Sequence, residues 1–240
     1  MYGSGSQSFS PVNYDNPLRY YRLTERFYGV NDASASAAMR DWYRIGSSPQ
    51  NMATPAASAG SMGTKGIVAD VGTNEHTIWS QYYADVGPLV PGAALTIRVR
   101  PQAGAFSANA AFTFGIQGVA NVAPRVLAGI DFLGFRYDTG VDGNWHLVVK
   151  DAAGGAGAET TVDLGAVDTT NWTTYRLVYT STGVAGYTNG VLKGTAALTH
   201  LDTARVWINA MSAYNVSASG ASQRICDATL YDLIVPTGGW

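Results

Sequence analysis

The stretch TNWTTYRLVYTSTGVAGYTNGVLKGT, residues 170–195, decides the fold of this chain. Its first half alternates between large apolar residues and polar or smaller ones, which is the two-residue period of a half-buried β-strand. Asn189-Gly190 separates two further runs, and both residues tolerate the positive φ of a tight type I′ hairpin turn. The stretch therefore predicts antiparallel strands. We expect these of its residues to face a hydrophobic core: Trp172, Tyr175, Leu177 and Tyr179.

The same period continues through the chain from residue 64 onward. It is clear in ALTIRVRP, AAFTFGIQG, NWHLVVKD, TTVDLGAV, ARVWINAMS and TLYDLIVP, and we expect further strands in GIVADV, HTIWSQYYADV and LAGIDFLGFRYD. Turn sequences such as VDGN and AAGGAG separate the runs. About ten short strands joined by regular turns, with almost no helical period, predict an all-β, antiparallel two-sheet sandwich.

Residues 1–62 have a different character, with several prolines, a Gly/Ser-rich start and the linker-like run NMATPAASAGSMG. We divide the chain into an extended N-terminal arm with a linker, residues 1–62, and a sandwich domain, residues 63–240. The arm segment NDASASAAMRDWYR favours one short helix. The arm is rich in aromatic residues and arginines, which are enriched at interfaces. It either docks on a partner or folds back on its own sandwich. The partner-binding candidates are Arg19, Tyr20, Tyr21, Arg22, Arg26, Phe27, Tyr28, Trp42, Tyr43 and Arg44.

The order of the runs WHLVVKD, TVDLGAV, NWTTYRLVY, GYTNGVLKGT and ATLYDLIVP resembles the concanavalin A-like jelly roll of laminin G and pentraxin type. This resemblance covers roughly residues 64–240 and implies a fold that hosts lectins, glycosidases and structural modules. The chain also resembles phage structural proteins in its low charge, its richness in Ala, Gly, Ser and Thr, and its arm before a β-sandwich.

The composition argues against export, a membrane span and nucleic-acid binding. With a net charge of −2 and only 13% charged residues, no global field draws the chain to nucleic acid or to an anionic membrane. No run approaches the ~18 apolar residues of a membrane span, and MYGSGSQSFSPV lacks the features of a signal peptide. The single cysteine, Cys226, permits no intrachain disulfide and is expected to be buried and inert. We expect synthesis in a host cytoplasm.

No catalytic or zinc motif stands out, so we do not expect an enzyme. The resembling glucanases carry a Glu-x-Asp-x-(x)-Glu pattern on one strand, and none of Glu25, Glu75 and Glu159 belongs to such a pattern; Asp131 has no carboxylate partner two or four residues away. The histidines are far apart in sequence, without metal-ligand spacing. Because His146 alternates with core residues, we expect it to face solvent or to pack at an edge.

The run RYDTGVDGNW contains oxygen donors of the kind that calcium accepts: Asp138, Asp142 and Asn144. The resemblance to laminin G-like and pentraxin-like domains implies that a weak calcium site is conceivable. We favour the alternative that this is a hairpin loop whose side chains cap backbone amides, and expect no cofactor.

Carbohydrate binding would require exposed aromatic rings beside Asp or Asn. Most of the tryptophans are expected in the core, since each buries a large apolar area. Our leading hypothesis is a non-enzymatic virion structural protein, a phage capsid decoration or tail protein that the arm anchors to other virion proteins, and that forms homo-oligomers shielding its edge strands. The alternative is a lectin-like module that binds a surface glycan for host attachment.

Overall fold

The computed structural model describes residues 20–25, 44–45, 66–69, 76–79, 86, 88–101, 110–118, 130–138, 143–151, 159–201, 207–215 and 223–236. This part of the chain is almost entirely β-structure. Its strands are β1 (Tyr20–Glu25), β2 (Arg44–Ile45), β3 (Gly66–Ala69), β4 (His76–Trp79), β5 (Ala94–Pro101), β6 (Ala110–Gln117), β7 (Phe132–Asp138), β8 (Asn144–Lys150), β9 (Glu159–Ala166), β10 (Thr173–Tyr179), β11 (Val184–Thr188), β12 (Val191–Ala196), β13 (Ile208–Asn215) and β14 (Gln223–Pro236).

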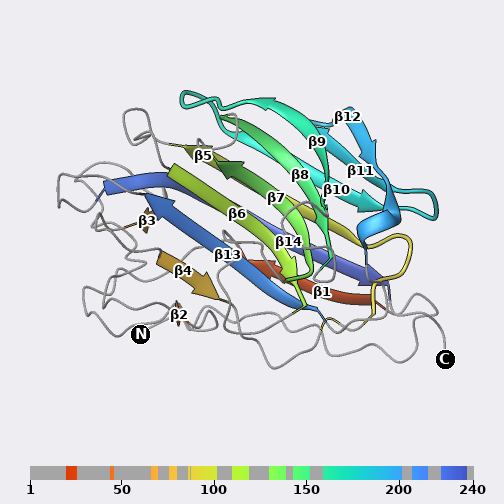
Figure 1. The fold of residues 1–240 in the computed structure, drawn as a ribbon. Coiled ribbons are helices and arrows are strands. Elements are labelled where there is room, and N and C mark those ends of the chain that lie inside the picture. Colours follow the sequence, from red (N-terminus) through yellow and green to blue (C-terminus); the bar gives the residue numbers. More distant parts are fainter. Residues whose placement is uncertain are drawn as a thin grey trace, which may run out of the picture.

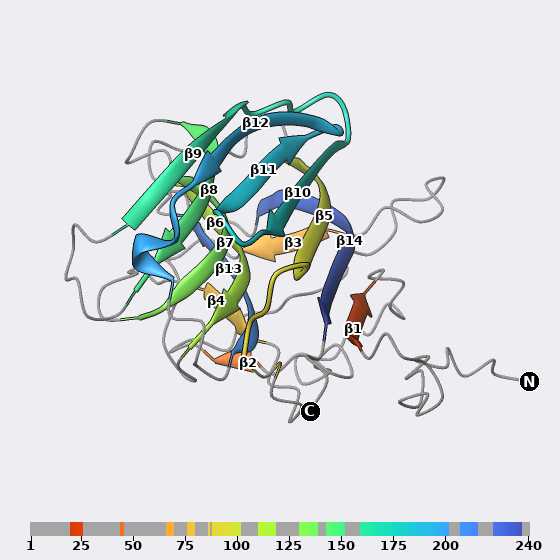
Figure 2. The ribbon, with the colours of Figure 1, turned by 90° about the vertical axis from the view of Figure 1, so that its right-hand side faces the viewer.

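The strands form two antiparallel sheets that face each other, which confirms the predicted sandwich (Figure 1). We call the sheet with strand order β2-β4-β13-β6-β7-β8-β9 the front sheet. The sheet with order β1-β14-β5-β10-β11-β12, with β3 also paired to β14, is the back sheet, and Figure 2 shows its strands side by side. The helical element of the described part is a 3-10 turn, Leu198–His200, and no helix there is long and apolar enough to cross a membrane.

The core between the sheets follows the alternation in the sequence. Tyr175, Leu177 and Tyr179 of β10 are buried in it, as predicted. The centroid of the Trp145 ring on β8 lies 5.0 Å from that of Tyr175, so the two sheets meet through aromatic rings. The other large core side chains include Leu95, Ile97, Val99, Phe112, Phe114, Phe135, Leu147, Trp207, Tyr231, Leu233 and Val235.

The hairpin of β11 and β12 has the turn that the sequence predicts. Asn189 and Gly190 have φ of 49° and 81°, so both positions lie in the left-handed region. The turn is fastened to β10, because the Asn189 N–H donates to the Thr174 carbonyl at 2.7 Å and the Thr174 N–H donates to Asn189 Oδ1 at 2.9 Å. This contact fixes the tip of the hairpin beside the start of β10.

Candidate binding site

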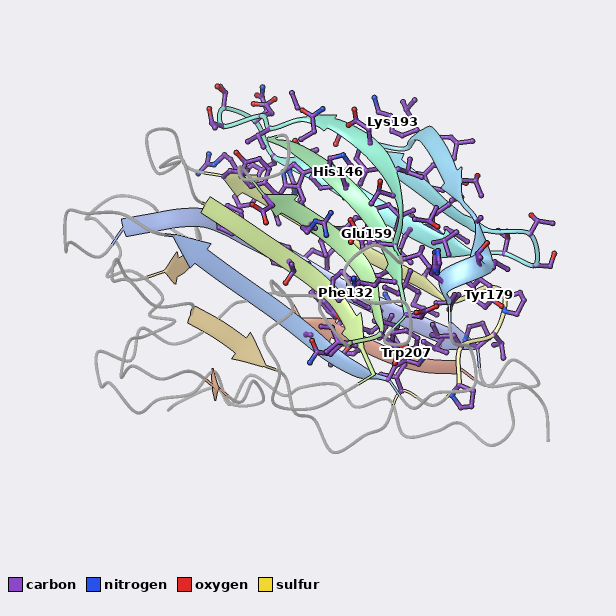
Figure 3. All side chains as sticks on the ribbon, in the orientation of Figure 1. Phe132, His146, Glu159, Tyr179, Lys193 and Trp207 are labelled. Atoms are coloured by element: carbon purple, nitrogen blue, oxygen red, sulfur yellow. The ribbon has the colours of Figure 1, made fainter. Side chains whose placement is uncertain are left out.

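The outer face of the front sheet carries charged side chains that point away from the core. Arg136 on β7 lies opposite His146 on β8, and Lys150 on β8 lies opposite Glu159 on β9. We call these four residues the ionic cluster; Figure 3 labels His146 and Glu159. Arg136, His146 and Lys150 are buried. His146 lies on the face away from the core residues Trp145 and Leu147, as its alternation predicts. It is buried, however, and β8 lies between β7 and β9, so the expectation that it faces solvent or an edge is wrong.

Arg136 and Glu159 form a two-point ion pair across β8. Arg136 Nη1 donates to Glu159 Oε2 at 2.9 Å, and Nη2 donates to Oε1 at 2.8 Å. Burial by itself raises the pKa of Glu159, but the hydrogen bonds and charge of Arg136, together with the charges of Lys150 and His146, outweigh it. The pKa of Glu159 therefore lies below its ordinary value. Glu159 is held as a carboxylate and is unsuited to donate a proton near neutral pH.

The centre of the same face is apolar. Phe132 packs there with Ile130 and Val148 (Figure 3 labels Phe132). A Cβ built on Gly115 or on Gly134 would lie 2.8 Å from Phe132 Cζ, so the ring occupies the space that these two neighbouring glycines leave. The protein's own side chains thus fill the middle of the front sheet's outer face.

The two described carboxylates on the outer face of β9 are each held by partners within the protein. Glu159 is paired with Arg136, and Asp163 lies four positions further along β9, a Cα separation of about 13 Å. Asp163 also has other partners, since Oδ1 accepts the Gly165 N–H at 2.7 Å and Oδ2 accepts from Asn144 Nδ2 at 3.1 Å. Asp131 is buried just before β7.

The calcium candidates lie at the β7–β8 connection. Asp138 ends β7 and Asn144 begins β8, while Asp142 is outside the described residues. Asn144 turns its amide toward Asp163, a residue that the sequence analysis did not single out. Among the described residues, no group of three or more His, Cys, Asp or Glu could hold a metal ion. Calcium binding stays a hypothesis.

The outer face of the back sheet carries an aromatic ring beside two arginines. Trp172, just before β10, is only half-buried, and the Cζ atoms of Arg100 and Arg98 on β5 lie 4.9 Å and 5.5 Å from its ring centroid. The prediction that Trp172 belongs to the core is wrong. Thr173 is the buried residue beside Val99, and because side chains alternate along a strand, the preceding residue, Trp172, faces the opposite side of the sheet. The signal was present in the sequence: Trp172 is out of phase with Tyr175.

Hydrogen bonds on both sides of Trp172 hold the backbone next to it. Asp168 Oδ1 accepts the N–H groups of Thr170 and Asn171, both at 2.8 Å, and Oδ2 accepts from Asn171 Nδ2 at 3.0 Å. These donors, the Asn171 N–H above all, hold the pKa of Asp168 below its usual value. On the other side of Trp172, the Asn189 turn is bonded to Thr174. The backbone before and after Trp172 is therefore held by hydrogen bonds, which limits the positions that the ring can take.

The arm candidates are only partly within the described residues. Tyr20, Tyr21 and Arg22 lie on β1, which pairs with β14 of the same chain, and Arg44 lies on β2. Arg22 Nε and Nη2 donate to Asp232 Oδ1 and Oδ2 at 3.0 and 3.1 Å. This six-residue segment is therefore part of the back sheet. The candidates outside the described residues are Arg19, Arg26, Phe27, Tyr28, Trp42 and Tyr43.

Solved structures share this architecture at low sequence identity. The carbohydrate recognition domain of Emp46p, potassium-bound form, matches with a TM-score of 0.56 and 10% identity over 81% of this chain and 88% of that domain. The β-glucanase of Bacillus licheniformis matches with a TM-score of 0.52 and 15% identity over 90% of this chain and 98% of the enzyme. A protein of unknown function from Shewanella oneidensis MR-1 matches with a TM-score of 0.53 and 14% identity over 92% of this chain and 90% of that protein.

These likenesses define the class: the described strands form a concanavalin A-like sandwich, as the sequence predicted. No protein-family model and no curated protein matches the sequence. Because both a carbohydrate recognition domain and a glucanase share the fold, it leaves binding and catalysis both open, and the choice depends on the site.

Proposed function

We propose that this chain is a non-enzymatic carbohydrate-binding module whose ligand lies on the outer face of the back sheet. The observation that carries the proposal is the half-buried Trp172 indole, held outside the core on a face where Arg98, Thr174 and Arg176 also point outward. Sugar-binding surfaces pair an apolar ring, which packs on the C–H face of a sugar, with hydrogen-bond donors for its oxygens. The shared fold of the Emp46p carbohydrate recognition domain supports the proposal by analogy.

The anchoring of Trp172 also supports a binding role. Asp168 and Asn189 hold the backbone on the two sides of the ring through hydrogen bonds of 2.7 to 3.0 Å. A ring that is fixed before the ligand arrives loses little conformational freedom on binding, and affinity improves accordingly.

Binding is favoured over hydrolysis by the state of the front-sheet carboxylates. Hydrolysis of a glycosidic bond needs a protonated acid beside a second carboxylate. Glu159 is instead paired with Arg136 at two points, with its pKa lowered. Asp163, four positions further along β9, accepts hydrogen bonds from Asn144 and from the Gly165 N–H.

The experiment is a binding screen of the full chain against immobilised neutral and acidic polysaccharides, followed by titration of any that bind. We expect at least one to bind and Trp172→Ala to weaken it at least tenfold. The matched control is Thr161→Ala, an exposed position on the outer face of the front sheet. Absence of binding across the panel, or release of reducing sugar from any polysaccharide, contradicts the proposal.

A further inference from the structure

We infer that the ligand is an anionic polysaccharide, bearing carboxylate or sulfate groups that Arg98, beside Trp172, and Arg176, on β10, bind. This inference rests on the proposed function and names the ligand class of the same surface. We define the arginine patch as Arg98, Arg100, Trp172, Arg176 and Tyr187, which lie on or next to β5, β10 and β11 (Figure 2).

The strand register makes the patch continuous. Arg98 lies opposite Thr174, and Arg176 lies opposite Thr96 on one side and Tyr187 on the other. Arg98 and Arg176 are exposed, while Trp172 and Tyr187 are half-buried. Thr174 lies between Trp172 and Arg176 on the outward side of β10 and directly beside Arg98 on β5. The cationic and aromatic side chains therefore share one sheet face, with cross-strand neighbours about 5 Å apart.

The patch has positive charge that its own face does not neutralise. Asp232 on β14 accepts from both Arg22 and Thr24, so its charge is already paired. Asp227 holds the register position opposite Arg100. Within the described part of the chain, no carboxylate forms an ion pair with Arg98 or Arg176. Two guanidinium groups thus remain for a ligand in a protein whose net charge is −2.

The chemistry of guanidinium favours an anion over a neutral sugar. A guanidinium stacked on an indole uses its flat face for that contact, and its N–H donors stay in the plane. Those donors match a carboxylate or a sulfate in two parallel hydrogen bonds. Arg98 over Trp172 therefore combines an aromatic surface with two parallel charged N–H donors in one place.

A single-stranded nucleic acid is the competing occupant, since it also combines anions with rings. Its affinity comes mainly from neutralising many phosphates. Two arginines without an ion-pair partner, in a protein with a net charge of −2, can neutralise few phosphates. An anionic polysaccharide therefore fits this surface better than a nucleic acid does.

The experiment measures binding of the full chain to three polymers at low and high salt: polygalacturonate for carboxylate, dextran sulfate for sulfate and dextran as the neutral polymer. We expect one or both anionic polymers to bind at least tenfold tighter than dextran, and salt to weaken them. Arg98→Gln and Arg176→Gln should each reduce that affinity roughly tenfold, and Arg98→Lys less. The control is Lys193→Gln, which removes one exposed charge from β12 at the sheet edge (labelled in Figure 3).

The outcomes separate the two proposals. Equal binding of dextran and the anionic polymers, lost in Trp172→Ala, overturns the inference and keeps the sugar-binding function. Binding of no polysaccharide at all overturns both. Tighter binding of a single-stranded oligonucleotide than of any polysaccharide, or equal losses in Lys193→Gln and Arg98→Gln, contradicts the inference as well.

Discussion

Arg136 on β7 binds both carboxylate oxygens of Glu159 on β9, across the whole width of β8. The pair links three strands of the front sheet by side chains as well as by backbone. Because Arg136 is buried while Glu159 is partly exposed, the pair lies at the boundary between the sheet and solvent. It therefore ties the stability of this sheet to pH.

We predict that the chain loses stability in acid through Glu159. A carboxyl group with a lowered folded-state pKa stabilises the fold above its unfolded pKa, here near 4.5, and that contribution disappears as the pH falls through the folded value. Urea unfolding at pH 7 and at successive pH values below 4.5 measures the loss. In Glu159→Gln the same decrease should be smaller; an identical pH dependence in both proteins would assign the effect to other groups.

We predict that Tyr231→Phe lowers the free energy of unfolding by about 1–2 kcal/mol. The Tyr231 hydroxyl on β14 lies 2.8 Å from the Gly115 carbonyl and 3.0 Å from Asn209 Oδ1, both on the front sheet, so it joins the two sheets through the core. Thermal and urea unfolding measure the change. Tyr179→Phe, at a core tyrosine at the end of β10, is the control; equal effects would mean that the inter-sheet bond has no particular role.

We predict that Gly190→Ala costs about 1 kcal/mol of stability and Gly134→Ala clearly more. A Cβ at Gly190 meets nothing within 4 Å, so its cost is the positive φ of 81° alone. A Cβ at Gly134 would overlap the Phe114 carbonyl oxygen and lie 2.5 Å from Gly115 Cα, both backbone atoms that cannot move aside. Urea unfolding of both variants gives the order. The reverse order would contradict the close approach of β6 and β7.

We predict that Asp232→Ala releases β1 from the back sheet without unfolding the sandwich. The variant removes the acceptor of Arg22 and Thr24, the side chains that fasten this edge strand to β14. Hydrogen exchange at residues 20–25 should become at least tenfold faster, while β10 keeps its protection. Equal acceleration in β10 would show that the substitution destabilises the whole sandwich.

The role in a virion stays a prediction. Its test must keep β1 and β2, because both strands lie in the N-terminal segment and belong to the sheets. Deleting residues 1–46 would remove both strands, so a failure to assemble could reflect damage to the sheets. Replacing Phe27, Tyr28, Trp42 and Tyr43 by alanine leaves both strands in the chain. We expect this variant to fold with an unchanged Tm and to be missing from purified particles. Normal incorporation into particles would contradict anchoring by the arm.

Much of the sandwich could be predicted because strand formation depends on neighbours in sequence. The alternation of Tyr175, Leu177 and Tyr179 identifies their shared face whatever they pack against, and Asn189-Gly190 specifies its turn through φ alone. The same alternation also places Trp172 on the opposite face, but its size suggested the core. In the structure the two-residue period, and not the size of the indole, determines the face on which Trp172 lies.

The binding surface could not be predicted in this way, because its parts come from separate strands. Arg98 and Trp172 meet only because β5 and β10 are neighbours in the back sheet. Arg22 and Asp232, which are 210 positions apart, pair only because β1 joins the edge of β14. From residue 64 onward, the sequence by itself determined most of the strands, their core-facing sides and the hairpin turn, since each depends on local sterics and a two-residue period; it did not predict β1 or β2, which lie in the segment that it marked as an arm. Only the tertiary structure decided which outward-facing side chains become neighbours, because strand order depends on the packing of the whole sandwich.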